Sequence, residues 1–396
     1  MARAARAFFF LALLAALIFI YTPVVSWESV TPSVDLFLAL WVLLGFWAFM
    51  RRQVFLGALF LGLSLGTKGV LVFLPMAAML PILAKWKSKD LLAVVGIAGL
   101  FFTPYLLRNF FLTGNPVFPF FPQFLGAGGM DPQVSANIQQ QILAKEISLI
   151  GFFKSFWNMS LFPQKYGPDI GGLYLIFIPI GIIIFLRSKK SQIIRLTATF
   201  CLIFYALWYL LAVATSRYLL PVFPFLAILT AITALYLIKL ARITRFLTIT
   251  ILVLSIPMSF LTYFWTFEPY GPKIKAALGI YGRQEYILRL LPYAADFFWV
   301  NDNLPADAKL ILYFSSWQRP FYLDRPFIVA GNLQREIDFS RPELLSDKRW
   351  FINQLKSHAV THIYSSVPVL DQVNEELIYQ GSFGNIYRII YWNGGW

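Results

Sequence analysis

The sequence has little charge and almost no residues that bind metals through sulfur or imidazole. Only 13% of its 396 residues are charged, and it contains one cysteine and two histidines. A single cysteine excludes an intramolecular disulfide and a thiolate metal cluster, and we expect Cys201, in an apolar run, to be a packing residue. His358 and His362 lack the carboxylates of a recognisable zinc motif. No motif implies a metal, and a carboxylate-bound divalent cation is the one cofactor left open.

Apolar residues dominate instead. Hydrophobic residues make up 59% of the chain, aromatic residues 18%, and the mean hydropathy is +0.67. This composition excludes an ordinary soluble globular protein. Apolar runs of about 16–24 residues, separated by basic clusters, are long enough to cross a hydrocarbon layer as helices. We predict a multi-pass α-helical membrane protein with about nine membrane helices, at roughly 7–26, 35–50, 53–66, 69–84, 91–108, 172–187, 194–214, 217–238 and 246–266.

The net charge of +14 is distributed unevenly along the chain. One set of loops carries fourteen basic residues against one acidic residue, whereas the alternate loops carry six against five. The remainder, from residue 268, carries thirteen of each. A basic excess on one face is the positive-inside pattern and argues against nucleic acid as a partner. We therefore expect location in the cytoplasmic (inner) membrane, a cytoplasmic N-terminus and an extracytoplasmic C-terminal segment.

The chain divides into two predicted domains. Residues 1–267 form the membrane domain, in which 109–171 is too polar to cross yet rich in Phe and Trp, as expected for an outer loop in the membrane interface. Residues 268–396 have the pattern of a small extracytoplasmic α/β domain. Its predicted strands are 310–314, 360–364 and 385–390, and its predicted helices are 284–302 and 347–357.

Polar residues at the outer ends of the predicted helices are the candidate site. Ionisable side chains there are costly and usually serve a ligand, a partner or a pathway. Cations beside a carboxylate suit an anionic lipid headgroup such as a phosphate ester. Simpler roles compete, because Lys68 and Arg108 can snorkel to lipid phosphates and Asp35 can complement the dipole of its helix. The candidates are Asp35, Lys68, Arg108, Asn109, Arg217 and Tyr218, with Glu28 as a second choice.

Several segments resemble a known family when read in order. They are Val34–Trp41, Gly57–Lys68, Pro104–Asn109, Thr113–Pro119 and Ser216–Pro224, followed by Asn303–Ala308 and Arg319–Pro326. Together they resemble the GT-C glycosyltransferases, especially the bacterial relatives of protein O-mannosyltransferases and lipid A aminoarabinose transferases. The resemblance covers nearly the whole chain.

The resemblance implies transfer of a sugar from a polyprenyl-phosphate donor to a lipid, glycan or protein acceptor on the outer side of the membrane. It implies that Asp35 is the acidic residue of the second outer loop, our candidate catalytic residue, and that Lys68, Arg217 and Tyr218 are candidates to bind the donor phosphate. Glu28, Arg108 and Asn109 are further substrate-site candidates.

Members of the family normally carry two more helices and a large acidic outer loop ahead of the first helix seen here. That loop carries the acidic residue that acts as general base in the family. We therefore expect a shortened copy or a fragment, with base catalysis by another residue such as Asp35 as the alternative. A catalytically silent member of the fold, and a transporter or lipid flippase, are the alternatives.

Overall fold

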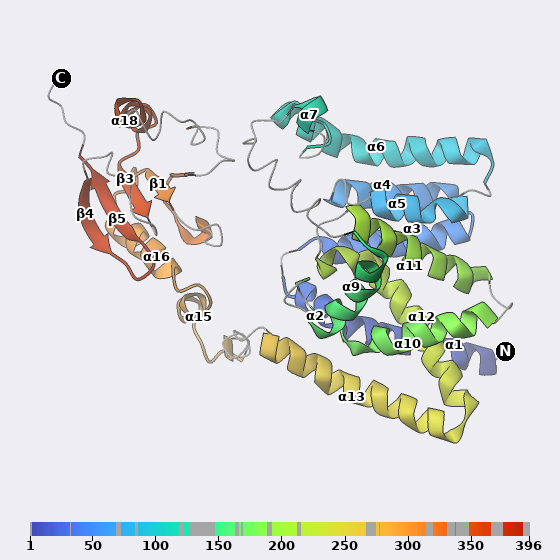
Figure 1. The fold of residues 1–396 in the computed structure, drawn as a ribbon. Coiled ribbons are helices and arrows are strands. Elements are labelled where there is room, and N and C mark those ends of the chain that lie inside the picture. Colours follow the sequence, from blue (N-terminus) through green and yellow to red (C-terminus); the bar gives the residue numbers. More distant parts are fainter. Residues whose placement is uncertain are drawn as a thin grey trace. The chain divides into compact units, whose positions relative to one another are not determined.

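A computed structural model describes most of the chain, and its described residues form two compact units that meet at Thr266. The described residues are 2–31, 33–68, 73–83, 86–118, 122–126, 147–162, 166–167, 169–187, 192–211, 215–266, 275–276, 278–313, 320–330, 337, 348–365 and 375–390. Figure 1 traces both units in the order of the sequence.

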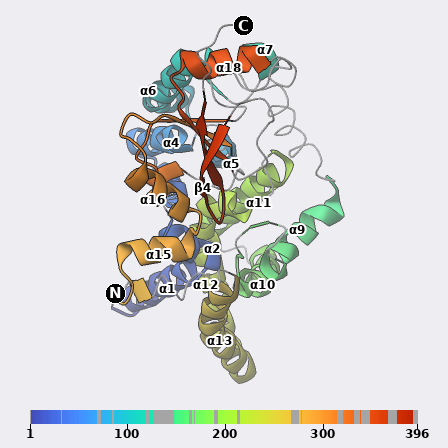
Figure 2. The same ribbon diagram turned by 90° about the vertical axis from the view of Figure 1, so that its left-hand side faces the viewer.

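The first unit is helical. Its elements are α1 (Ala2–Ile20), α2 (Pro23–Ser29), α3 (Asp35–Met50), α4 (Val54–Lys68), α5 (Phe73–Leu83), α6 (Ser88–Thr113), α7 (Pro122–Leu125), α9 (Leu149–Leu161), α10 (Gly172–Arg187), α11 (Gln192–Leu211), the 3-10 helix η3 (Ser216–Val222), α12 (Phe223–Leu240) and α13 (Arg242–Thr266). Helices α3, α4 and α6 lie side by side, and α12 packs against α1, α10 and α13 (Figures 1 and 2).

Fewer helices are long enough to span a membrane than the sequence predicted. Among the described residues, three helical stretches pass by length and apolar composition: Ser88–Thr113, Gln192–Leu211 and Ser216–Leu240. The bent pair Ala5–Ile20 and Pro23–Ser29 makes a fourth if it is one span. Asp35–Met50, Val54–Lys68 and Gly172–Phe185 are apolar but shorter. The multi-pass helical character is thus present, whereas the count of nine spans is not confirmed.

The first predicted helix, 7–26, is broken in the structure. Helix α1 ends at Ile20, and α2 leaves it at an angle of 73°. The cause is local, because Pro23 occupies the first turn of α2 and Thr22 before it is extended, with φ −65° and ψ 121°. A residue that precedes proline is sterically disfavoured from helical geometry. The break directs α2 to a new position, which matters for the site.

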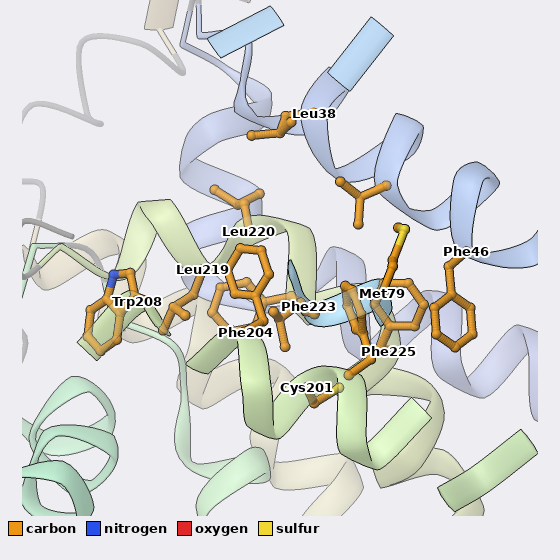
Figure 3. Packing of buried hydrophobic residues seen from close by; sticks show 14 of the residues in the cluster. Leu38, Phe46, Met79, Cys201, Phe204, Trp208, Leu219, Leu220, Phe223 and Phe225 are labelled. Carbon is orange, nitrogen blue, oxygen red and sulfur yellow. The ribbon is translucent and has the colours of Figure 1, made fainter. Parts of the chain in front are cut away.

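Large aromatic side chains form the core of the helical unit. Phe46 of α3, Phe200 of α11 and Phe225 of α12 meet with ring centroids 4.7–5.3 Å apart. Figure 3 shows Phe46 and Phe225 of this core together with Cys201, which is buried there as a packing residue. Small residues let α4 approach its neighbours, since a Cβ on Gly62 would lie 2.9 Å from the Ala98 carbonyl oxygen of α6.

The predicted interfacial stretch, 109–171, is partly helical. Its first five residues continue α6 to Thr113, so the helix is longer than predicted and Asn109 lies within it. Helix α9 buries Ser155 and Met159 and exposes apolar side chains such as Phe153 and Trp157. An exposed apolar face is suited to contact with lipid. Residues 127–146 lie outside the described residues.

The second unit is a mixed α/β fold. It contains α15 (Arg283–Leu290), α16 (Ala294–Asn303), β1 (Leu310–Tyr313), the 3-10 helix η4 (Pro320–Tyr322), β2 (Phe327–Val329), α18 (Lys348–Ser357), β3 (His362–Ser365), β4 (Glu375–Gln380) and β5 (Asn385–Ile389). The described strands form one sheet in the order β2-β1-β3-β5-β4. Strand β1 is parallel to β2 and β3, and β5 is antiparallel to β3 and β4.

Two details of this unit differ from the sequence prediction. The helix predicted over 284–302 is two helices, because the chain breaks at Leu291–Tyr293, where Pro292 lacks the amide proton that a continuous helix needs. Strands β2 and β4 were not predicted. Strand β4 pairs only with β5 among the described strands and has an irregular register between Leu377 and Tyr379, so it lacks a clear alternating pattern.

Candidate functional site

An antiparallel hairpin brings the first two site residues together. Helices α3 and α4 are 16 and 15 residues long and are joined by a short turn, so the start of α3 lies beside the end of α4. Asp35 opens α3 and Lys68 closes α4, and the two side chains form an ion pair. Each charge also complements the dipole of its own helix. Because α3 and α4 are nearly equal in length, the first residue of α3 and the last residue of α4 lie close enough for this ion pair.

Asp35 is held at both carboxylate oxygens. Lys68 Nζ contacts Oδ1, and the Ser33 hydroxyl donates to Oδ2 at 2.5 Å. The Asp35 amide in turn donates to Ser33 Oγ at 3.3 Å. The carboxylate is buried, with 3% of its side chain exposed. These contacts fix its position.

The 3-10 helix η3 supplies the second cation and an aromatic ring. The Ser216 amide donates to the Tyr166 carbonyl at 2.7 Å, and Trp208 Nε1 donates to the Thr215 carbonyl at 3.0 Å. These bonds anchor the start of η3 against α11 and the segment before α10. The following residues, Arg217 and Tyr218, are thereby placed next to α3.

Tyr218 lies between the two cations. Lys68 Nζ is 4.6 Å from the centroid of its ring, and Arg217 Cζ is 5.4 Å from the same centroid. Both distances fall within the range of cation–π attraction. The ring therefore offsets part of the repulsion between two positive groups gathered at one place.

Glu28, near the end of α2, completes the cluster. Arg217 Nε lies 3.8 Å from Glu28 Oε1 and 3.8 Å from Asp35 Oδ2, so the guanidinium bridges the two carboxylates. Thr31 donates to Glu28 Oε2 at 3.3 Å. The Oε1 atom is buried and has no hydrogen-bond partner among the described residues. A buried carboxylate oxygen without a hydrogen bond is costly and rare in proteins.

Burial is uneven across the cluster of Glu28, Asp35, Lys68 and Arg217, which we call the ion cluster. The carboxylates are 0% and 3% exposed, whereas the Lys68 and Arg217 side chains are 18% and 35% exposed. Two negative and two positive charges cancel within it. The two cationic side chains of the ion cluster are therefore partly exposed, and the two buried carboxylates neutralise their charge.

Two predicted site residues lie elsewhere. Arg108 is exposed on α6 and forms no ion pair with any residue that the structure describes. Asn109 is buried and donates through Nδ2 to the Pro116 carbonyl at 3.3 Å. It closes the turn that follows α6, in which Gly114 adopts φ +74° as the helix cap. Neither residue contacts the ion cluster among the described positions, and Asn109 has a structural role.

No group of three or more His, Cys, Asp or Glu side chains gathers in the described part of the chain in a way that could hold a metal ion. Glu28 and Asp35 are two carboxylates, and both face cations. His358 contacts the Gln354 carbonyl, and His362 lies in strand β3 with Nδ1 against Thr361 Oγ1. These contacts assign the imidazoles to local packing of the second unit.

Sequence reasoning gave too little weight to two features. Glu28 ranks second on the sequence because its position predicts greater exposure than Asp35. The structure contradicts this, since the break before Pro23 places Glu28 beside Arg217 with its side chain 0% exposed. Asp169 was counted only as a loop charge. A signal was present in the sequence, since Asp169 stands in the run Gly-Pro-Asp-Ile-Gly-Gly directly before an apolar helix, where a carboxylate is expected to be held by the backbone.

The fold and the site define a helical integral membrane protein with a self-neutralised ion cluster at one end of its helices. Residues 3–127 match a family model described as a domain of unknown function, DUF8201. A crystal structure of ArnT from Cupriavidus metallidurans bound to undecaprenyl phosphate is similar, with a TM-score of 0.44 and 13% sequence identity, covering 95% of this chain and 78% of that chain. No curated protein sequence matches the chain.

Proposed function

We propose that the protein is a membrane glycosyltransferase that uses a polyprenyl-phosphate-linked sugar as donor. One observation carries the proposal: Lys68 of α4 meets Arg217 and Tyr218 of η3, and the two partly exposed cations lie over two buried carboxylates. Cations fixed in advance stabilise a phosphate whose charge increases during a reaction, most strongly where water is scarce. The ion cluster has that arrangement.

The chemistry follows from the charges. The bond between the sugar C1 and the phosphate oxygen breaks, and its electron pair stays on the phosphate, which leaves with one more negative charge. Lys68 and Arg217 stabilise this charge. The acceptor oxygen forms the new bond to C1, and its proton passes to a carboxylate. A contact that is stronger to the doubly charged leaving group than to the donor accelerates the reaction.

The two carboxylates suit different roles. Both oxygens of Asp35 are engaged, by Lys68 and by Ser33, so Asp35 is suited to positioning the lysine. Glu28 keeps Oε1 without a hydrogen bond, 3.8 Å from Arg217. A general base must have an oxygen available for the incoming proton. We therefore propose Glu28 as the base and Asp35 as a positioning residue, in place of the catalytic role that the family resemblance gives Asp35.

The charge bias of the loops supports a location for the reaction. Lys68, Glu28 and Arg217 belong to the loops with nearly balanced charge, and the basic excess lies in the other set. By the positive-inside rule, the ion cluster faces the extracytoplasmic side of the cytoplasmic membrane. The acceptor would be a lipid, glycan or protein that reaches this side.

Substitution of the two cations tests the proposal. Lys68→Ala and Arg217→Ala should each weaken binding of polyprenyl phosphate by about tenfold or more, because loss of a charge-assisted contact costs about 1.5–3 kcal/mol. The measurement is a titration of polyprenyl phosphate, with the phosphate-free polyprenol for comparison, into protein in nanodiscs. Lys154→Ala, which removes an exposed cation from α9, is the matched control.

The outcomes separate the alternatives. Equal affinity for polyprenyl phosphate and polyprenol, or unchanged affinity in both variants, would overturn the phosphate site. Movement of donor lipid across a bilayer without sugar release would identify a flippase. Phosphate binding without release of sugar from any tested donor would identify a catalytically silent fold.

A further inference from the structure

A cavity of about 310 Å³ lies in the helical unit, away from the ion cluster. It is partly open and lies where α1 ends and α10 begins, beside the C-terminal end of α9 and the middle of α13. Most of its walls are apolar, with Ile18, Leu173 and Leu254 as examples. The shape and lining suit an apolar chain rather than a water-soluble molecule.

One carboxylate breaks the apolar lining. Asp169 lines the cavity and is 6% exposed. The Gly171 amide donates to its Oδ1 at 2.7 Å, and the Val24 amide donates to its carbonyl at 2.9 Å, so the residue is fixed on both sides. Gly171 has φ +79°, and a Cβ there would lie 3.3 Å from Pro23, so the close approach of this loop to α2 favours glycine. The carboxylate position is built into the fold.

No basic side chain accompanies Asp169 among the residues described around the cavity. The other lining groups that titrate are the phenols of Tyr21 and Tyr174, and the Tyr174 hydroxyl is already bonded to Thr22 at 2.7 Å. Burial raises the pKa of Asp169 to about 6. A buried carboxylate without a cation gains most from a ligand that donates hydrogen bonds or brings a positive charge.

We infer that this cavity binds the headgroup end of an amphiphile whose polar group donates hydrogen bonds, a lipid hydroxyl or ammonium, to Asp169. An anionic headgroup is disfavoured, because its negative charge would lie beside the Asp169 carboxylate in an apolar cavity. The cavity should therefore prefer neutral or cationic headgroups, whereas the ion cluster, with its exposed cations, should prefer anionic ones.

Helix α2 connects the two sites. Pro23 lies at the cavity and Glu28 in the ion cluster, about 7–8 Å apart along the helix axis. A headgroup bound at Asp169 and an anionic donor bound at the ion cluster would thus lie at the two ends of one short helix. On the proposed function, on which this step rests, the cavity binds a polar group of the acceptor lipid other than the one that reacts.

Photolabelling in nanodiscs tests the site without any sugar donor. The probes are three alkyl chains of equal length that carry a diazirine and end in an ammonium, a hydroxyl or a phosphate. The labelled peptides are mapped by mass spectrometry. We expect the ammonium or hydroxyl probe, or both, to label 169–176 and 251–258 at least about fivefold above the phosphate probe.

Variants assign the labelling to the cavity. Ser255→Phe fills it from α13 and should reduce labelling, whereas Val253→Phe adds the same ring at an exposed position that does not line it. Asp169→Asn should reduce ammonium labelling most. Equal labelling by the phosphate probe, or labelling unchanged in Ser255→Phe, would overturn the inference. Because no transfer is measured, failure here is distinguishable from failure of the polyprenyl-phosphate site.

Discussion

At the residue scale, the decisive difference in the ion cluster is between Glu28 and Asp35. Both are buried acids facing Arg217 at 3.8 Å, yet Asp35 is bonded through both oxygens and Glu28 leaves Oε1 unbonded. Their amide variants keep shape and remove charge, so they isolate the role of each carboxylate.

Glu28→Gln should lower the rate of sugar transfer by about 10²–10⁴ while binding of polyprenyl phosphate is retained, because a general base contributes that much to rate. The measurement is single-turnover release of sugar from donor, with phosphate binding measured in parallel. Asp35→Asn is the comparison and should weaken phosphate binding by releasing Lys68. A larger loss of rate in Asp35→Asn, with binding unchanged, would return the base role to Asp35.

Some residues of the ion cluster can be identified from the sequence alone. Lys68 and Arg217 are identifiable because a charge beside an apolar helix is unusual, and the structure brings both to Asp35, with the Tyr218 ring beside the two cations. Arg108 and Asn109 carry the same signal, yet one is exposed and the other caps a turn. Residue type at a helix end does not encode which neighbour it meets.

At the element scale, the contact between α4 and α6 supports the site. A Cβ on Gly62 would lie 2.7 Å from Phe101 Cβ and 2.9 Å from the Ala98 carbonyl oxygen. Lys68 follows Gly62 on the same helix by about 9 Å along its axis. If a larger side chain at Gly62 pushes α4 away from α6, Lys68 should shift as well and change the geometry of the ion cluster.

Gly62→Ala should destabilise the protein by about 1–3 kcal/mol, the usual range for overpacking. It should also weaken phosphate binding. Gly96→Ala in α6 is the control, since a Cβ there meets nothing within 4 Å and alanine favours helix by up to about 1 kcal/mol. Thermal unfolding in detergent reports the first effect. Equal stability of the two variants would show that α4 and α6 are not tightly packed at Gly62.

At the scale of the whole molecule, the small α/β unit carries its own pH dependence. His362 lies in β3 opposite Arg388 of β5, and its Nε2 is buried without a hydrogen-bond partner among the described residues. Burial, together with the charge of Arg388, lowers the pKa of His362 below its ordinary value of 6.5. The folded unit therefore binds a proton less readily than the unfolded chain.

By linkage, a lowered folded-state pKa gives stability that is present above about pH 6.5 and is lost as the pH falls. Strand β3 should open more often at about pH 5 than at about pH 7.5. Hydrogen exchange of residues 362–365, corrected for intrinsic rates, measures this opening. His362→Gln should reduce the difference, with His358→Gln as matched control. The same difference in both variants would assign the effect to other groups.

The sequence by itself determined that this is an apolar, multi-helix chain followed by an α/β unit, because hydropathy runs and strand alternation are local patterns. It also determined which charges are unusual. Only the tertiary structure decided which helices among the described residues are long enough to span a membrane, that Glu28 rather than Arg108 joins Asp35, and that Asp169 lines a cavity. The bend before Pro23 is local, but the contacts that α2 then makes with η3 and with Asp169 join residues distant in the chain, and no local pattern specifies them.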